Sequence, residues 1–386
     1  MLYDIRRNGE RMEKLNMLNI VLSGGPASGK STSLSRIEAE LSSRLGYKIL
    51  ICPETATELI ANGIAPSAAI PGDEFQEVMF RKQMAKEELY RDVAAKYYDN
   101  EKTIILYDRG LLDQLAYMTK DAFTKLIERH GQTMASITSR YDAVIHLVTS
   151  AIGTDCYTTA NNQARHETAE EAAALDKKTL DANVHHPHLR VIDNSTGFDA
   201  KIQRVLHVIY DIIGEPVPSE IERKFLIEYP DANAFASMAM LYAHKNDIIQ
   251  TYLRSAEKGV ERRVRQRGTK ADGYSFYYTE KTPVSDIERI EKERKITMQE
   301  YVSLLAEADN TLHQVMKERI CFVYDNQYFE LDIYPFSDTQ AIIEIELSDK
   351  ASDVAFPPFL KCIKEVTNDD RYKNHSLAET LAFPAE

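Results

Sequence analysis

The stretch SGGPASGKST, residues 23–32, follows a short apolar run and precedes a helical pattern. It satisfies the spacing G-x-x-x-x-G-K-[ST], in which glycines turn backbone N–H groups towards phosphate oxygens and the lysine reaches the β- and γ-phosphates. The following helix adds the partial positive charge of its N-terminus. We therefore predict a site for ATP or GTP with Mg²⁺, the cation being placed by Ser31. The predicted ligands are Gly24, Gly25, Ser28, Gly29, Lys30, Ser31 and Thr32.

Strand-like and helix-like segments alternate around this motif up to about residue 213. Short, branched apolar runs such as TIILYDRG and AVIHLVT are separated by longer helical patterns. Such alternation is typical of a parallel sheet with helices on both faces. We predict an α/β P-loop NTPase domain over residues 17–214, after an N-terminal extension at 1–16. The helical patterns cover residues 30–44, 72–99, 110–130, 166–183 and 198–213.

Two carboxylates and an arginine at strand ends are candidates for catalysis. Asp108 ends the strand TIILYD and is positioned to hold Mg²⁺, and Arg109 follows it. Glu54, in ICPETATELI, ends the second predicted strand, where it would act on an acceptor as a general base or as a substrate ligand. The alternative for both carboxylates is helix capping.

Two further polar residues are candidates on the nucleotide side of the sheet. Arg165 precedes a helical pattern and would close over the phosphates as a lid, where it would stabilise spreading charge. Its alternative is a solvated charge at a helix start. Asn194 follows the last strand and would lie beside a nucleobase, unless it is a satisfied turn residue.

The segments PETA, YDRG and VIDNST, with the arginine before the lid helix, resemble the P-loop nucleoside and nucleotide kinases. The resemblance is closest to nicotinamide-riboside-kinase-like ATPase domains. It implies nucleotide binding and a small-molecule acceptor for any kinase activity, without identifying the acceptor.

Beyond a linker at 215–218, charged or polar residues alternate with apolar residues at every second position. In EIERKFLIE, Glu220, Glu222 and Lys224 share one face of a strand. Other strand-like segments repeat the theme, so we predict an antiparallel sheet or barrel with a charged interior over residues 219–386. Basic side chains there would neutralise a polyphosphate, and carboxylates would hold a divalent cation. The alternative is a set of solvated sheet faces.

EIERKF resembles the E-x-E-x-K signature of the CYTH, or triphosphate tunnel metalloenzyme, family, and the order of later charges is similar. The resemblance implies an α+β domain with an eight-stranded antiparallel tunnel that binds triphosphates with Mg²⁺ or Mn²⁺. Glu220, Glu222 and Lys224 are its candidate catalytic residues. The implied metal-side acids are Glu220, Glu222, Asp332, Glu344 and Glu346, and the implied phosphate ligands are Lys224, Arg263, Arg265, Lys281, Arg289, Arg319 and Arg371.

The two halves in this order resemble the TRPL translocation defect protein family. Its animal members are linked to GTP and phosphatidic-acid binding and to membrane-protein trafficking. Two hypotheses follow. The first is an enzyme that hydrolyses inorganic triphosphate or a nucleoside triphosphate; the second is a nucleotide-dependent regulatory protein that binds an anionic ligand, such as a lipid headgroup, with little turnover.

Composition narrows the class of protein. The 386 residues carry a formal net charge of −13, which argues against a generic nucleic-acid binder. No apolar run approaches the length of a membrane span, and the charged N-terminus lacks the apolar core of a secretory signal. The cysteines have no metal-ligand or redox spacing, so we expect reduced thiols in a cytoplasmic protein. They are Cys52, Cys156, Cys321 and Cys362.

Overall fold

The computed structural model describes six stretches of the chain. They are residues 17–153, 168–214, 221–257, 259–283, 289–347 and 353–384. The predicted N-terminal extension (1–16) and linker (215–218), together with Arg165 and Glu220, lie outside the described residues, as does the side chain of Arg289.

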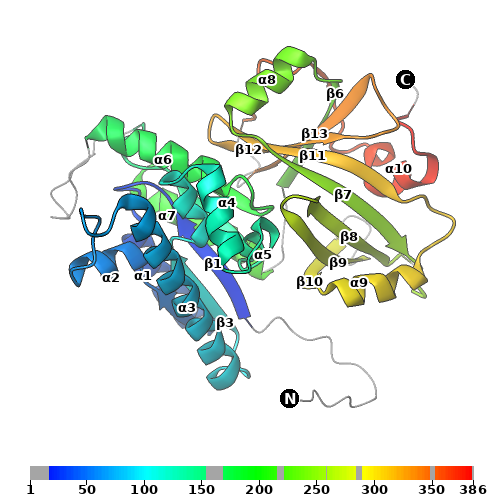
Figure 1. The fold of residues 1–386 in the computed structure, drawn as a ribbon. Helices are drawn as coiled ribbons and strands as arrows, with labels where there is room; N and C mark the ends of the chain where they lie inside the picture. Colours follow the sequence, from blue (N-terminus) through cyan, green and yellow to red (C-terminus); the bar gives the residue numbers. More distant parts are fainter. Residues whose placement is uncertain are drawn as a thin grey trace.

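The first domain is built on a five-stranded parallel sheet, which confirms the predicted α/β architecture (Figure 1). Apolar, largely buried segments form its strands, in the spatial order β2-β3-β1-β4-β5. All four neighbouring pairs are parallel, and Leu22 lies opposite Asp108 at the end of β1 and β3. The strands are β1 (Met17–Ser23), β2 (Lys48–Cys52), β3 (Thr103–Asp108), β4 (Ala143–Leu147) and β5 (Leu189–Ile192).

Helices cover both faces of this sheet. α1 (Lys30–Leu45) and α7 (Phe198–Ile213) pack on one face, and α3 (Gly72–Tyr97) and α6 (Ala169–Asn183) pack on the other. The predicted helix at 110–130 is instead divided, because the Thr119 hydroxyl accepts a hydrogen bond from Ala122 N–H and caps a new helix. The shorter helices are α2 (Thr55–Ala61), η1 (Leu111–Ala116), α4 (Lys120–Arg129) and α5 (Met134–Thr138).

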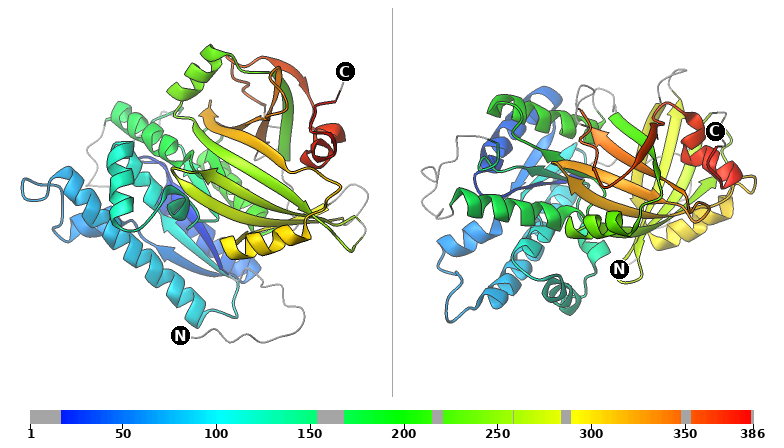
Figure 2. Two further views of the ribbon diagram at one scale, coloured as in Figure 1. Left: turned by 45° about the vertical axis from the view of Figure 1, so that its right-hand side comes forward. Right: turned by 90° about the horizontal axis from the view of Figure 1, so that it is seen from above.

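The second domain is a strongly curved antiparallel sheet, seen to the right in Figure 1 and from two other sides in Figure 2. Its order is β10-β9-β8-β7-β11-β12-β13-β6-β14. The curved antiparallel sheet is consistent with the predicted tunnel, but the predicted count of eight strands is wrong, because a ninth strand, β14, pairs with β6. The described pairings also leave the sheet open, since none joins β10 to β14. The strands are β6 (Ile221–Glu228), β7 (His244–Leu253), β8 (Glu261–Thr269), β9 (Gly273–Pro283), β10 (Arg289–Ile296), β11 (Val315–Tyr324), β12 (Gln327–Ile333), β13 (Gln340–Leu347) and β14 (Cys362–Glu365).

Short helices accompany this sheet. The predicted helix at 231–243 is α8 (Ala232–Met240), and the pattern at 297–313 yields only α9 (Met298–Leu304) and the 3₁₀ turn η2 (Leu305–Glu307). Near the carboxyl end, η3 (Asp370–Tyr372) leads into α10 (Asn374–Thr380). None of the helices in the described stretches is long and apolar enough to span a membrane.

The two domains share a packed interface. Edge strand β5 of the parallel sheet contacts β12 of the antiparallel sheet, and Tyr328 packs in the same apolar cluster as residues of β1, β3 and α6. Lys295 donates hydrogen bonds to the carbonyl oxygens of Ser139 (2.7 Å) and Tyr141 (2.6 Å). The backbone also joins across the interface, since Ala135 N–H donates to the carbonyl oxygen of Asp272.

Candidate functional sites

The predicted phosphate loop lies between β1 and α1, as the motif requires. Gly24 and Gly29 have φ values of 139° and 89°, a region of backbone conformation that favours glycine. Lys30 folds back over the loop and donates to the carbonyl oxygens of Gly24 (2.9 Å) and Gly25 (3.1 Å). Burial and nearby Arg109 lower the pKa of Lys30 to about 8. An anionic phosphate at this loop would favour the charged form of the lysine.

The charges of three predicted catalytic residues, Glu54, Asp108 and Arg109, act on Lys30. Arg109 Nε donates to Glu54 Oε1 at 2.5 Å, and Thr57 donates to the other oxygen of Glu54 at 2.6 Å. Burial opposes the charge of Glu54, but Arg109, Lys30 and the hydrogen bond from Thr57 together outweigh it and lower the pKa of that carboxyl. The structure therefore shows Glu54 as the partner of Arg109, with its charge already neutralised.

Asp108 has a different environment. Burial raises the pKa of its carboxyl, although Lys30 opposes this effect. Its Oδ1 atom is buried and has no hydrogen-bond partner among the described residues. A buried carboxylate oxygen without a donor fits a role as a ligand of Mg²⁺ or of a water on Mg²⁺.

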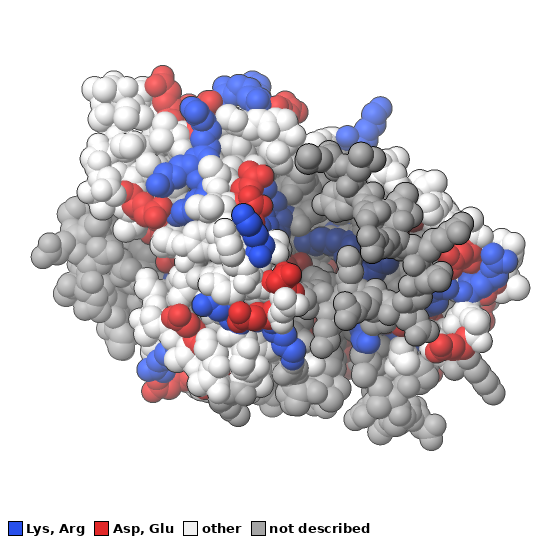
Figure 3. Space-filling view, turned by 90° about the horizontal axis from the view of Figure 1, so that it is seen from below, with Lys and Arg blue, Asp and Glu red and all other residues white. Residues whose placement is uncertain are grey.

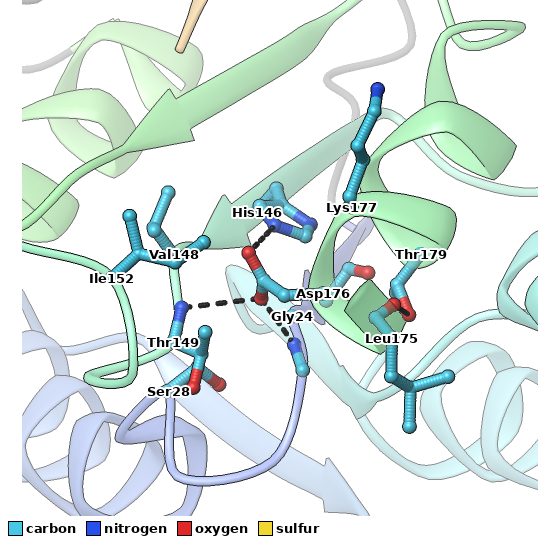
Figure 4. A network of polar contacts seen from close by, with 12 residues as sticks. Gly24, Ser28, His146, Val148, Thr149, Ile152, Leu175, Asp176, Lys177 and Thr179 are labelled. Carbon is cyan, nitrogen blue, oxygen red and sulfur yellow. Dashed lines mark hydrogen bonds and ion pairs between the residues drawn. The ribbon is translucent and has the colours of Figure 1, made fainter. Parts of the chain in front are cut away.

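Asp176 on α6 clamps the phosphate loop, which the sequence analysis did not anticipate. Its Oδ1 accepts hydrogen bonds from Gly25 N–H (2.6 Å) and Thr149 N–H (3.1 Å), and His146 Nε2 lies 3.3 Å from Oδ2 (Figure 4). Burial opposes the charge of Asp176, but His146 and the amide donors outweigh it and lower its pKa. Helix α6 is thus fastened directly to the loop.

Asn194 is a satisfied turn residue, which was the alternative to its predicted place beside a nucleobase. Its side-chain amide donates to the carbonyl oxygens of Thr149 and Ile152, both at 2.7 Å, and its Oδ1 accepts from Lys201 at 2.8 Å. These contacts make it a hydrogen-bonded turn residue that fixes the loop after β4. Contact with a nucleobase stays a prediction.

The second site is a large cavity that lies on the concave side of the antiparallel sheet and extends along the first domain, and we call it the lumen. In-register pairing brings the alternating charges of neighbouring strands to this face: Lys224 lies opposite Glu344, and Glu222 lies opposite Glu346. A space-filling view from below shows basic side chains within a hollow (Figure 3). Among the predicted residues, the lumen is lined by Glu222, Lys224, Arg263, Arg265, Lys281, Arg319, Glu344 and Glu346.

Acids and bases of the lumen form a connected network. Lys224 Nζ lies 2.7 Å from Glu344 Oε1 and 3.5 Å from Glu222 Oε1. Burial works against the charge of Glu344, but Lys224 and Arg319 outweigh it and hold its pKa well below the usual range. The repulsion of Glu344, together with burial, raises the pKa of Glu222 to about 7. This part of the lumen therefore has more acidic groups than nearby positive charge can keep ionised.

Arg319 and Asp332 lie at the base of the lumen. Arg319 donates to Asp332 (2.6 Å) and Glu344 (2.6 Å) and also pairs with Glu330. Lys317 pairs with Asp332 as well, and Asp332 is fully buried. Asp332, predicted as a metal-side acid, is thus observed as the counter-ion of two basic residues.

The predicted Arg371 lies elsewhere than expected. Its side chain is exposed and pairs with Asp369 within the same turn, at 2.7 Å, and it is not among the residues that line the lumen. Lys373 of the same segment does line the lumen. Contact of Arg371 with phosphate stays a prediction.

Several lumen residues were missed from the sequence. Lys317 and Arg267 are buried basic residues of the lumen, and Glu330 is an acid there. The signal was present, because Lys317 stands two residues before Arg319 and Arg267 two residues after Arg265, on the same strand faces.

A preformed metal-binding cluster is not seen. Across the described stretches, no group of three or more His, Cys, Asp or Glu side chains is arranged to hold a metal ion. The ion pairs of the lumen explain this, because Lys224 and Arg319 occupy the oxygens of Glu344, and Glu346 is paired with Arg190 of the first domain.

Comparisons with known proteins find different relatives for the amino-terminal and carboxyl-terminal parts of the chain. The family model of an AAA domain matches residues 19–201. An inorganic triphosphatase from Nitrosomonas europaea is 30% identical over 166 residues, which are 42% of this chain and 99% of that protein. The chain belongs to the family of this triphosphatase. The match confirms a CYTH-like carboxyl-terminal part, whereas membership of the TRPL family stays a prediction.

Two solved structures are similar to parts of this chain. A crystal structure of an inorganic triphosphatase is 30% identical, covers 43% of this chain and 97% of its own, and has a TM-score of 0.30. The crystal structure of thymidylate kinase from Ehrlichia chaffeensis is 14% identical, covers 50% of this chain and 98% of its own, and has a TM-score of 0.34.

Proposed function

We propose that this protein is a metal-dependent triphosphatase whose first domain binds ATP or GTP. The observation that carries the proposal is the lumen, where the acids of β13 and β6 face basic residues of β8 and β11. Its relationship to an inorganic triphosphatase supports inorganic triphosphate as the substrate, and a nucleoside triphosphate presents the same group. The AAA domain match supports nucleotide binding by residues 19–201.

The charges of the lumen fit a substrate with three linked phosphates. Arg263, Arg265 and Lys224 would neutralise the phosphate oxygens, which is the chemistry that clusters of basic side chains provide. On binding, a phosphate would replace Glu344 as the partner of Lys224 and release a carboxylate oxygen. The ion pairs of the lumen therefore keep the basic side chains in place without substrate.

The acids of the lumen fit Mg²⁺ or Mn²⁺. Glu222, Glu344 and Glu346 supply carboxylate oxygens, which these hard cations prefer. The raised pKa of Glu222, caused first by Glu344, supports binding of a cation beside these two acids in addition to Lys224. A divalent cation bound there would supply a Lewis acid that polarises a phosphoryl oxygen. The acids would then fix its position beside the basic wall.

In the first domain, Lys30 and the loop amides would bind the phosphates, with Ser31 and Asp108 on the side of Mg²⁺. The ion pair with Arg109 occupies Glu54, so an acceptor would have to separate the two before Glu54 served as a base. Phosphorylation of a small molecule is therefore the less supported of the two activities.

Phosphate release from tripolyphosphate, ATP and GTP with Mg²⁺ or Mn²⁺ tests the proposal. Turnover should be lost in Glu222→Ala and kept in Lys30→Ala. Loss only in Lys30→Ala would assign the hydrolysis to the first domain and refute the proposal. No turnover of any substrate, with nucleotide still bound, would favour the regulatory alternative, in which the lumen holds an anionic ligand such as phosphatidic acid.

A further inference from the structure

The cavity of the lumen extends along the first domain, and two side chains of that domain contact charged residues of the second domain's sheet. His188 comes directly before β5 and Arg190 lies within it, and because they are two residues apart in extended chain their side chains point to the same side. Both line the same cavity as Lys224 and Arg265. Strand β5 is the edge of its sheet and contacts β12, which explains how residues of one domain enter the site of the other.

Arg190 holds an acid of the proposed metal site. Its Nη2 atom forms an ion pair with Oε1 of Glu346, and the two side chains are only 17% and 32% exposed. Glu346 lies directly opposite Glu222 in the pairing of β13 with β6. Nη1 of the same guanidinium is bound to the carbonyl oxygen of Leu189 at 3.2 Å. The guanidinium is thus hydrogen-bonded to its own strand and forms an ion pair with one oxygen of Glu346.

His188 makes a similar contact on the opposite wall. Its Nε2 lies 3.7 Å from Glu293 Oε1, while Thr279 donates to Oε2 of Glu293 at 2.9 Å. Arg265, a candidate phosphate ligand, also lies 3.7 Å from Glu293 Oε2. One short segment of the first domain therefore touches charged groups on both walls of the lumen.

We infer that the first domain completes the triphosphate site, and that Arg190 is a positioning residue for Glu346. By holding Oε1, Arg190 leaves Oε2 of Glu346 for a divalent cation beside Glu222 and Glu344. Hydrogen-bonding partners of metal-ligating carboxylates commonly act this way, and their loss typically weakens metal binding about 10- to 100-fold. The inference rests on the proposed function, because it assumes a cation in the lumen.

Binding of Mn²⁺ alone to the nucleotide-free full chain, followed by electron paramagnetic resonance, tests this role directly. Arg190→Ala should weaken Mn²⁺ binding at least about tenfold. Arg190→Lys, which keeps the charge, should recover part of the loss. In hydrolysis of tripolyphosphate, Arg190→Ala should raise the half-saturating Mg²⁺ concentration by a similar factor, with most of the maximal rate recovered at high Mg²⁺.

Arg204→Ala is the matched control. Arg204 belongs to the same domain and pairs with Asp193 at 2.7 Å, with side chains 20% and 34% exposed, away from the lumen. It should bind Mn²⁺ like the wild type. A general loss of stability would instead affect both variants alike.

The outcomes separate this inference from the proposed function. Equal Mn²⁺ affinity in wild type, Arg190→Ala and Arg190→Lys would overturn the role of Arg190, even if hydrolysis is confirmed. Weaker Mn²⁺ binding in Arg190→Ala, without turnover by any form, would support the role and refute the hydrolysis. If the wild type binds no Mn²⁺, or Glu222→Ala binds it equally well, both fail.

Discussion

Replacing His244 by glutamine will make the stability of the protein less sensitive to acid. His244 begins β7 and is only 7% exposed, and its ring centroid lies 3.9 Å from that of His185 across the domain interface. Burial, assisted by the charge of Arg267, lowers the pKa of His244 to about 4 from an ordinary value of 6.5. The folded protein therefore keeps this ring neutral.

The sign and size of the effect follow from that difference in pKa. Between about pH 6.5 and about pH 4 the unfolded state binds more protons at His244 than the folded state, so stability falls as the pH falls. Between about pH 7.5 and about pH 5 this single group would lower the free energy of unfolding by about 2 kcal/mol. His244→Gln removes the titrating group and should remove that part of the loss.

Scanning calorimetry suits the measurement, because the chain contains no tryptophan for a fluorescence assay. Wild type, His244→Gln and a control, His207→Gln, would be compared at the two pH values. His207 is solvent-exposed on α7, so its replacement should leave the acid sensitivity unchanged. If wild type and His244→Gln lost equal stability between the two pH values, the reasoning from burial would be refuted.

Three further predictions concern the two sites. Lys30→Ala should weaken ATP or GTP binding at least about tenfold, since it removes charge-assisted contacts, and calorimetry measures the affinity. Unchanged affinity would exclude this loop as the nucleotide-binding site. Gly25→Ala should lower the melting temperature and nucleotide affinity, because the new Cβ would lie 2.7 Å from Asp176 Cβ; a fully stable variant would contradict the clamp. Lys224→Met should raise the KM for tripolyphosphate at least about tenfold. Arg223→Met, on the other strand face, should leave the KM unchanged. Equal effects of the two substitutions would argue against the lumen as the substrate site.

The sequence predicted the first domain well because its signals are local. The glycine and lysine spacing of the phosphate loop and the apolar strands on either side follow directly from backbone geometry and burial. The misplaced boundary near Thr119 is also local, but a helix cap within a long helical pattern is easily overlooked. In contrast, the partner of Glu54 depends on how β2 and β3 lie side by side, which periodicity does not specify.

In the second domain, alternation identified the charged strand face but did not assign roles within it. Asp332 and Glu344 share that face, yet one is fully buried beneath Arg319 and the other meets Lys224 in the lumen. Their difference depends on the curvature of the sheet. Arg190 could not be found from the sequence, because its role arises from the docking of two domains.

The position of β5 has a consequence for how the two domains depend on each other outside the lumen. An uncovered edge strand offers unpaired backbone groups to other chains and is a common origin of aggregation. In this protein the antiparallel domain lies against that edge and shields it. The covalent fusion keeps this cover beside the edge once the whole chain has been synthesised, so we expect the second domain to limit association of the first through β5.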